Sequence, residues 1–101
     1  MSISDVQFKN NWYNVFDENN KKSASVPATA GELMGIGTDF FVLKKNNWYI
    51  TFDDRGKKIA DLSCTYGDFK NATGNSFNLV KGNWLTSFDK HCKKTGTRPA
   101  R

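Results

Sequence analysis

Three tryptophans, Trp12, Trp48 and Trp84, are spaced 36 residues apart, and each begins a closely similar short phrase. Seven positions agree in all three copies: a Lys three residues before the Trp, the preceding Asn, the Trp, a Phe and an Asp four and five residues later, and a Lys-Lys pair nine and ten residues later. Self-similarity at a fixed period of this size is typical of stacked or radially arranged copies of one supersecondary unit. The chain is therefore predicted to be a threefold structural repeat.

The phrase after each Trp is predicted to form a β-strand. In the second copy Trp48, Ile50 and Phe52 alternate with Tyr49 and Thr51, which is the period-2 pattern of a half-buried strand. We expect the Trp and Phe rings to face the core and the Tyr side chains to face solvent. On that basis, loss of the Trp48 side chain would cost roughly 3 to 5 kcal/mol of stability.

A hairpin turn with a bulge is predicted directly after this strand. The Asp53 side chain can accept hydrogen bonds from downstream amides, and Gly56 can supply a positive φ. The equivalents of Gly56 are Asn20, which tolerates this geometry, and Cys92, which adopts it at a cost of roughly 1 kcal/mol. A further strand follows each turn and two precede each Trp, except that the first copy lacks its opening strand. Eleven strands and no α-helix are therefore predicted.

Three such units restrict the fold to a small set of all-β architectures. Residues 1–101 are predicted to form a single all-β repeat domain, with copies at about 1–27, 28–63 and 64–98. The favoured arrangement is a β-prism with three sheets around a pseudo-threefold axis. A β-trefoil and a propeller completed by a second chain remain as alternatives, since a propeller usually has at least four blades.

The order of these elements resembles the monocot mannose-binding lectins. The shared features are an F-x-L strand, a strand that ends in Phe-Asp, a turn, and a strand that starts Lys-x-Ile. The resemblance implies a β-prism of three repeats. Those lectins bind mannose through Gln-x-Asp-x-Asn-x-Val-x-Tyr, and the aligned positions here are Lys44, Asn46, Trp48, Ile50 and Phe52. The Gln, Asp and Asn of that motif are absent, so the resemblance does not extend to mannose recognition.

Composition and charge exclude several classes of protein. The net charge is +5, and the last twelve residues hold five basic and no acidic side chains. Residues 1–5 lack the basic and apolar regions of a signal peptide, and no apolar run is long enough to span a membrane. A cytoplasmic protein without a membrane partner is expected. Cys64 and Cys92 lack metal-ligand spacing, so we expect free thiols, no metal and no cofactor.

Catalysis has little support in the residue inventory. His91 is the single histidine, and its neighbour Cys92 is expected to point away from it, with no third group to orient the pair. The repeated Asp17, Asp53 and Asp89 occupy a turn position where Asp is structurally favoured. No Gly-rich phosphate loop opens a helix. The chain is not expected to be an enzyme.

The leading hypothesis is a non-catalytic binding module that recognises a protein or glycan partner. A basic nucleic-acid-binding protein with a Lys/Arg patch is an alternative, and a structural unit that forms homo-oligomers is another. If the Lys-Lys pairs converge at one end of the molecule, they would form a positive patch. The candidate partner-binding residues are Tyr13, Tyr49, Lys57, Lys58, Lys93, Lys94 and Arg98.

Overall fold

The computed structural model describes residues 2–100, which form eleven strands and two short 3₁₀ helices. The strands make up three antiparallel sheets in chain order. Sheet 1 contains β1 (Ile3–Lys9), β2 (Trp12–Asp17) and β3 (Lys22–Pro27). Sheet 2 contains β4 (Glu32–Ile36), β5 (Phe40–Lys45), β6 (Trp48–Asp53) and β7 (Lys58–Ser63). Sheet 3 contains β8 (Asp68–Thr73), β9 (Ser76–Lys81), β10 (Trp84–Asp89) and β11 (Lys94–Pro99). The 3₁₀ helices η1 (Ala28–Ala30) and η2 (Cys64–Tyr66) connect the sheets.

Each sheet is a meander in which consecutive strands are neighbours. The first sheet lacks the strand that corresponds to β4 and β8, as the sequence predicts. In all three sheets the pairing with the last strand is shifted by a bulge between the repeated Phe and the residue before it, with the extra residue on the last strand. The all-β prediction and its strand count are therefore confirmed for residues 2–100.

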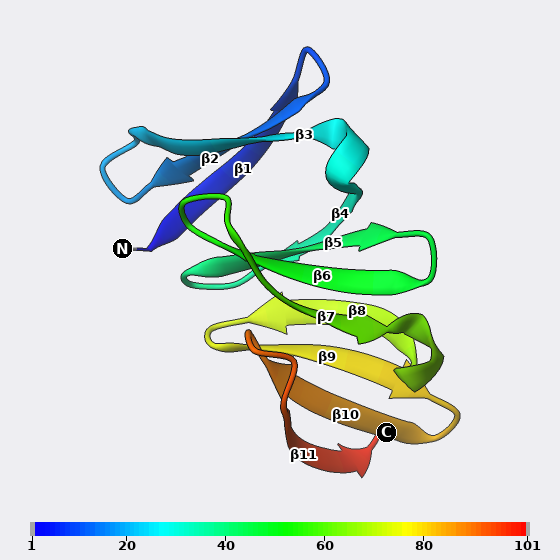
Figure 1. The fold of residues 1–101 in the computed structure, drawn as a ribbon. Coiled ribbons are helices and arrows are strands. Elements are labelled where there is room, and N and C mark those ends of the chain that lie inside the picture. Colours follow the sequence, from blue (N-terminus) through cyan, green and yellow to red (C-terminus); the bar gives the residue numbers. More distant parts are fainter. Residues whose placement is uncertain (1, 101) are drawn as a thin grey trace.

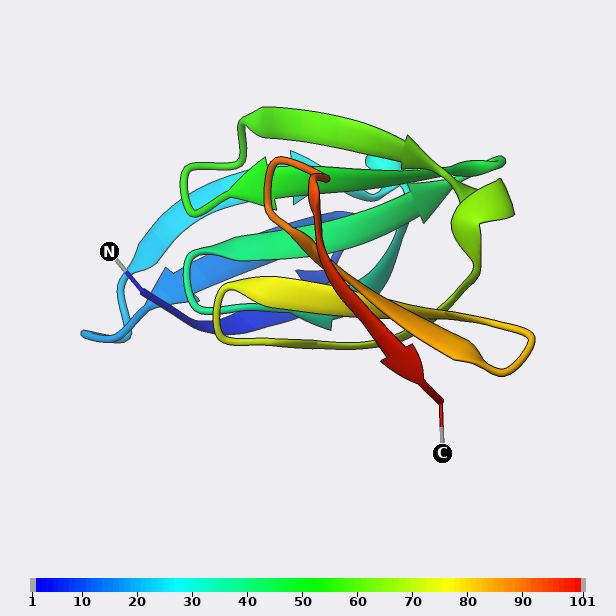
Figure 2. The same cartoon turned by 90° about the horizontal axis from the view of Figure 1, so that it is seen from below.

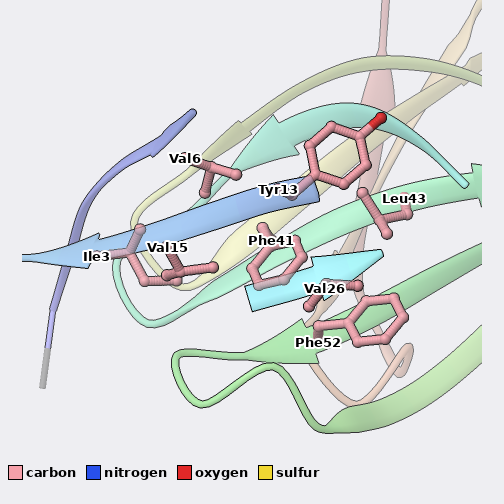
Figure 3. Packing of buried hydrophobic residues seen from close by; sticks show 8 residues of the cluster. All are labelled: Ile3, Val6, Tyr13, Val15, Val26, Phe41, Leu43 and Phe52. Atoms are coloured by element: carbon pink, nitrogen blue, oxygen red, sulfur yellow. The ribbon is translucent and has the colours of Figure 1, made fainter. Parts of the chain in front are cut away.

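The sheets follow one another as a stack, with the N-terminus beside sheet 1 and the C-terminus beside sheet 3 (Figure 1). Figure 2 shows the stack from below. One core cluster joins sheets 1 and 2, and Figure 3 shows its buried residues, among them Val15, Phe41 and Phe52. A second cluster joins sheets 2 and 3 around Phe40 and Phe77. Both faces of sheet 2 are therefore covered by protein.

The predicted β-prism and β-trefoil are not confirmed. A prism would bring three sheets around a shared axis, whereas here two separate clusters lie on opposite faces of the middle sheet. Phe41 and Leu43 belong to one cluster, and their strand neighbours Phe40 and Val42 belong to the other. Because neighbouring residues of a strand point to opposite faces, this run of four apolar residues requires a cover on each face.

The hairpin turn of each copy has the predicted Asp geometry. In sheet 2, Oδ1 of Asp53 accepts hydrogen bonds of 2.9 Å from the backbone N–H groups of Arg55 and Lys57. Asp17 and Asp89 make the same pair of bonds. The residues at the positive-φ position are Asn20, Gly56 and Cys92, with φ of 62°, 77° and 61°. The repeated Asp is thus a turn determinant.

The face of sheet 1 that no sheet covers is polar where the equivalent face of sheet 2 is apolar. Leu43 and Ile50 form a cross-strand pair that packs against sheet 1. Gln7 and Asn14 form the equivalent pair in sheet 1, and both are at least partly exposed. The difference follows from position in the stack, since terminal repeats need a polar outer face for solubility.

The free face of sheet 3 shows the same change. Phe40 and Val42 of sheet 2 are replaced there by Ser76 and Asn78. Asn78 is 7% exposed, donates a 2.7 Å hydrogen bond to Asn71, and accepts one of 2.6 Å from Ser87. Both ends of the stack therefore end in polar faces.

Candidate functional site

The three repeated tryptophans are exposed, which corrects the expectation that they face the core. Trp12, Trp48 and Trp84 retain 46%, 48% and 55% of their accessible surface. Each ring is on the first residue of its strand, next to the hairpin turn. Alternation along the strand predicts one buried and one solvated face, whereas sheet 2 is packed on both faces. The position at the strand end leaves Trp48 and Trp84 exposed, and Trp12 also lies on the face of sheet 1 that no other sheet of residues 2–100 covers.

Tyr13 and Tyr49 are buried, so their assignment as surface contacts is wrong. They are 9% and 2% exposed. The Tyr13 hydroxyl donates a 3.0 Å hydrogen bond to the carbonyl oxygen of Gly31 and accepts one of 3.3 Å from the backbone N–H of Leu33. The Tyr49 hydroxyl donates a 2.9 Å bond to Gly67, and burial is the largest cause that raises the pKa of Tyr49. Both side chains therefore have a structural role at the start of the following sheet.

The lysine pairs are exposed but lie away from the tryptophans. Lys57, Lys58, Lys93 and Lys94 are in or beside the turns that follow the Phe-Asp strands, at the opposite strand ends from the Trp. The three turns, β2–β3, β6–β7 and β10–β11, are on the left in Figure 1, while the hairpins that carry the tryptophans are on the right. Lys58 forms an exposed 2.8 Å ion pair with Asp61. Lys57, Lys58, Lys93 and Lys94 therefore form no common surface with the tryptophans, whereas Lys22 of the first pair lines a cavity together with Trp12.

Arg98, the remaining predicted site residue, is on β11. Its side chain is exposed and lines a shallow cavity of about 370 Å³ on sheet 3 together with Asn78 and Ser87. The basic C-terminal segment also includes Arg101, which lies outside the described residues. The structure does not bring Arg98 to the tryptophans of sheets 1 and 2.

A second set of lysines accompanies the tryptophans instead. Lys9 pairs with Trp12, Lys45 with Trp48, and Lys81 with Trp84, each directly across a hairpin. Directly opposed residues share a face of the sheet, so each ring has a cation beside it. All three lysines are exposed. These lysines are absent from the predicted site residues, although their invariance among the three copies is a sequence signal for them.

The two thiols are partly buried, whereas the histidine is exposed. Cys64 and Cys92 are free and only partly exposed, as expected from their spacing. Burial raises the pKa of Cys92 to about 11. His91 is exposed in the β10–β11 turn, where its backbone N–H donates to Asp89. Across residues 2–100, no three His, Cys, Asp or Glu side chains gather where they could hold a metal ion.

Comparisons with known proteins define the class of fold. No family model matches the chain, and no curated protein is similar to it in sequence. Among solved structures, BamB from Moraxella catarrhalis, a β-propeller protein, is similar with a TM-score of 0.52 and 9% identity. The likeness covers 100% of this chain and 37% of that one. The three stacked sheets are thus arranged like part of a propeller, and the chain spans well under half the length of this structural neighbour.

One further feature concerns membranes. Among the described residues, no helix has the length and apolar content that crossing a bilayer would need.

Proposed function

We propose that this protein is a non-catalytic binding module that recognises a protein or glycan partner through the hairpin end of its sheets. The observation that carries the proposal is the exposure of Trp12, Trp48 and Trp84 at equivalent positions of the repeat. A half-exposed Trp costs solubility and contributes little to a core, whereas Trp is enriched among residues that dominate binding energy. We name the hairpins β1–β2, β5–β6 and β9–β10, with their tryptophans and lysines, the Trp surface.

Two features support a role without catalysis. The raised pKa of Cys92 leaves little thiolate at neutral pH, and the thiolate is the reactive form. The repeated Asp17, Asp53 and Asp89 already accept two backbone hydrogen bonds each in their turns. Cys92 and the three repeated Asp residues are thus poorly suited to act as nucleophile or base.

Nucleic-acid binding is a second candidate, favoured by the lysine beside each Trp. Aromatic rings on which bases stack, combined with cations that contact phosphates, are typical of single-strand binding. The net charge of +5 has the right sign for it. Such binding would weaken steeply with salt, whereas recognition of a neutral glycan would not.

Homo-oligomer formation is less favoured. Ring closure through the free faces of sheets 1 and 3 would bury polar pairs such as Gln7 and Asn14. Burial of polar groups without new partners is unfavourable. The polar end faces therefore support a stack that ends in solvent.

The test compares the wild-type chain with the variant Trp12→Ala/Trp48→Ala/Trp84→Ala. Both are applied to a glycan array and to protein pull-downs, and any captured protein is purified and titrated directly. We expect the wild type to bind and the triple variant to lose binding while it keeps its β-sheet circular dichroism. Tyr66→Ala, which removes an exposed ring other than the three tryptophans, is the control. Equal binding by the triple variant would remove the basis of the proposal.

A further inference from the structure

The outer face of sheet 1 carries a cavity that the other two copies do not reproduce. It has a volume of about 520 Å³, within the range of small-molecule sites. Its lining residues come from β1, β2, β3 and the β1–β2 hairpin: Lys9, Asn10, Trp12, Asn14, Lys22 and Ser25. In the second copy the equivalent face is covered by sheet 1, and Ile50 replaces Asn14 in the apolar core. Only the first copy thus combines the exposed Trp with an open polar floor.

The polar side chains of this floor are arranged to offer hydrogen bonds. Ser25 donates a 2.9 Å hydrogen bond to Oδ1 of Asn14, and the two residues are directly opposed on β2 and β3. This bond orients the Asn14 amide, whose Nδ2 donors have no partner among residues 2–100. A solvated end face explains why these residues are polar. It does not explain why a Trp ring is retained beside them.

The charge of the cavity is positive. Lys9 and Lys22 line it, no carboxylate does, and neither lysine has an ion pair or a side-chain hydrogen bond among the described residues. Asp5 is on the same face, but its Oδ1 accepts from the backbone N–H of Val6 and its Oδ2 accepts from Gln7. The two lysines therefore remain available for an anionic ligand.

The spacing of the two lysines favours an extended ligand. Lys9 lies opposite Trp12 and Lys22 lies opposite Phe16, four residues further along β2. That separation is roughly 13 Å along the strand, more than a single phosphate or carboxylate would bridge. A short chain with an anionic group on successive units would reach both.

We propose that this cavity binds an acidic oligosaccharide, a chain of pyranose rings that carry carboxylates. The electronegative face of Trp12 attracts the polarised C–H bonds of one ring, Asn14 and Ser25 hydrogen-bond its hydroxyls, and Lys9 and Lys22 pair with the carboxylates. The inference rests on the proposed function and narrows its partner class at one of the three tryptophans. Single-stranded nucleic acid is the competing ligand, and the experiment separates the two.

The probes are an oligomer of galacturonic acid, the same oligomer with its carboxyl groups methyl-esterified, and a random single-stranded DNA of similar length. Calorimetric titration of the full chain should show binding of the free acid, and esterification should weaken it by about tenfold or more. Among the three indole N–H signals in the NMR spectrum, the one that Trp12→Ala removes should shift on titration. Tighter binding of the DNA than of the uronate would reassign the cavity to nucleic acid and overturn the proposal.

Three variants locate the site. Trp12→Ala and Asn14→Ile should each lower the affinity for the uronate by about tenfold or more, and Lys9→Gln/Lys22→Gln should abolish the preference for the free acid. Lys70→Gln/Lys93→Gln removes the same charge elsewhere and should leave the affinity unchanged. If the two double lysine variants lowered the affinity equally, the binding would depend on net charge alone, and the proposed site would be wrong. If wild type does not bind the uronate but still binds a partner that the triple Trp variant loses, only this inference fails. If every partner that the wild type binds is bound equally by the triple Trp variant, the proposed function fails.

Discussion

The hydroxyl of Tyr49 donates a 2.9 Å hydrogen bond to the carbonyl oxygen of Gly67, the residue that precedes the first strand of sheet 3. Tyr13 makes the equivalent bond to Gly31, before the first strand of sheet 2. Both glycines adopt φ near +147°, and a Cβ there would approach a backbone carbonyl to less than 3 Å. The Tyr therefore anchors the start of the next sheet. Among residues 2–100 no sheet follows the third copy, which carries Leu85 at the equivalent position.

Replacement of Tyr49 by Phe should destabilise the fold by about 1 to 3 kcal/mol, because the buried Gly67 carbonyl loses its partner. Urea denaturation measures the change. Tyr66→Phe is the control, since Tyr66 is 56% exposed. Equal midpoints for the two variants would mean that the Tyr49 bond contributes nothing.

Trp48→Ala should lower the free energy of unfolding by only about 1 kcal/mol or less, because its ring is half exposed. Phe41→Ala should cost about 3 to 5 kcal/mol, since Phe41 is fully buried and stacks on Phe52 at 5.3 Å between ring centroids. Thermal or urea unfolding of both variants compares them directly. Similar losses of unfolding free energy in the two variants would show that Trp48 contributes to the core as Phe41 does.

Cys92 should make stability depend on alkaline pH. Burial raises its pKa in the folded state from the ordinary 9.0 to about 11, so the folded protein holds this proton more tightly than the unfolded chain. The contribution is complete below pH 9.0 and is lost as pH rises toward about 11. Cys92→Asn keeps a residue that tolerates the positive φ, as Asn20 does, and removes the thiol. Urea midpoints at about pH 8 and about pH 10.5 should fall less for the variant than for the wild type. An identical fall in both would contradict the assignment.

Restoring apolar residues to the free face of sheet 1 should promote self-association. Gln7→Leu/Asn14→Ile gives this face the Leu43 and Ile50 pair of sheet 2, which is buried there against a neighbouring sheet. Sedimentation velocity should show a concentration-dependent dimer for this variant. Gln7→Ala/Asn14→Ala removes the same polar groups without a large apolar surface and should stay monomeric. A monomeric Leu/Ile variant would show that the polar face does not limit assembly.

Residue patterns predicted the repeat, its strands and its turns because these depend on local chemistry. The Asp and the positive-φ residue of each turn act within a few residues, so Asp53 and Gly56 were interpreted correctly. The candidate site could not be predicted in the same way. The exposure of the lysine pairs follows from their position in turns, but their distance from the tryptophans depends on the length and direction of the strands between them. Tyr13 and Tyr49 were placed outside because their hydroxyl partners, Gly31 and Gly67, are 18 residues away.

The sequence by itself determined a threefold all-β repeat with a missing opening strand, since period, alternation and turn residues are properties of neighbours along the chain. Tertiary structure alone decided which side chains are exposed. Alternation divides a strand into two faces but does not say how many of them another sheet covers, and in the middle sheet both are covered. The three tryptophans 36 residues apart are nevertheless on the surface, because each is the first residue of its strand beside a hairpin turn, and Trp12 also lies on the uncovered face of sheet 1.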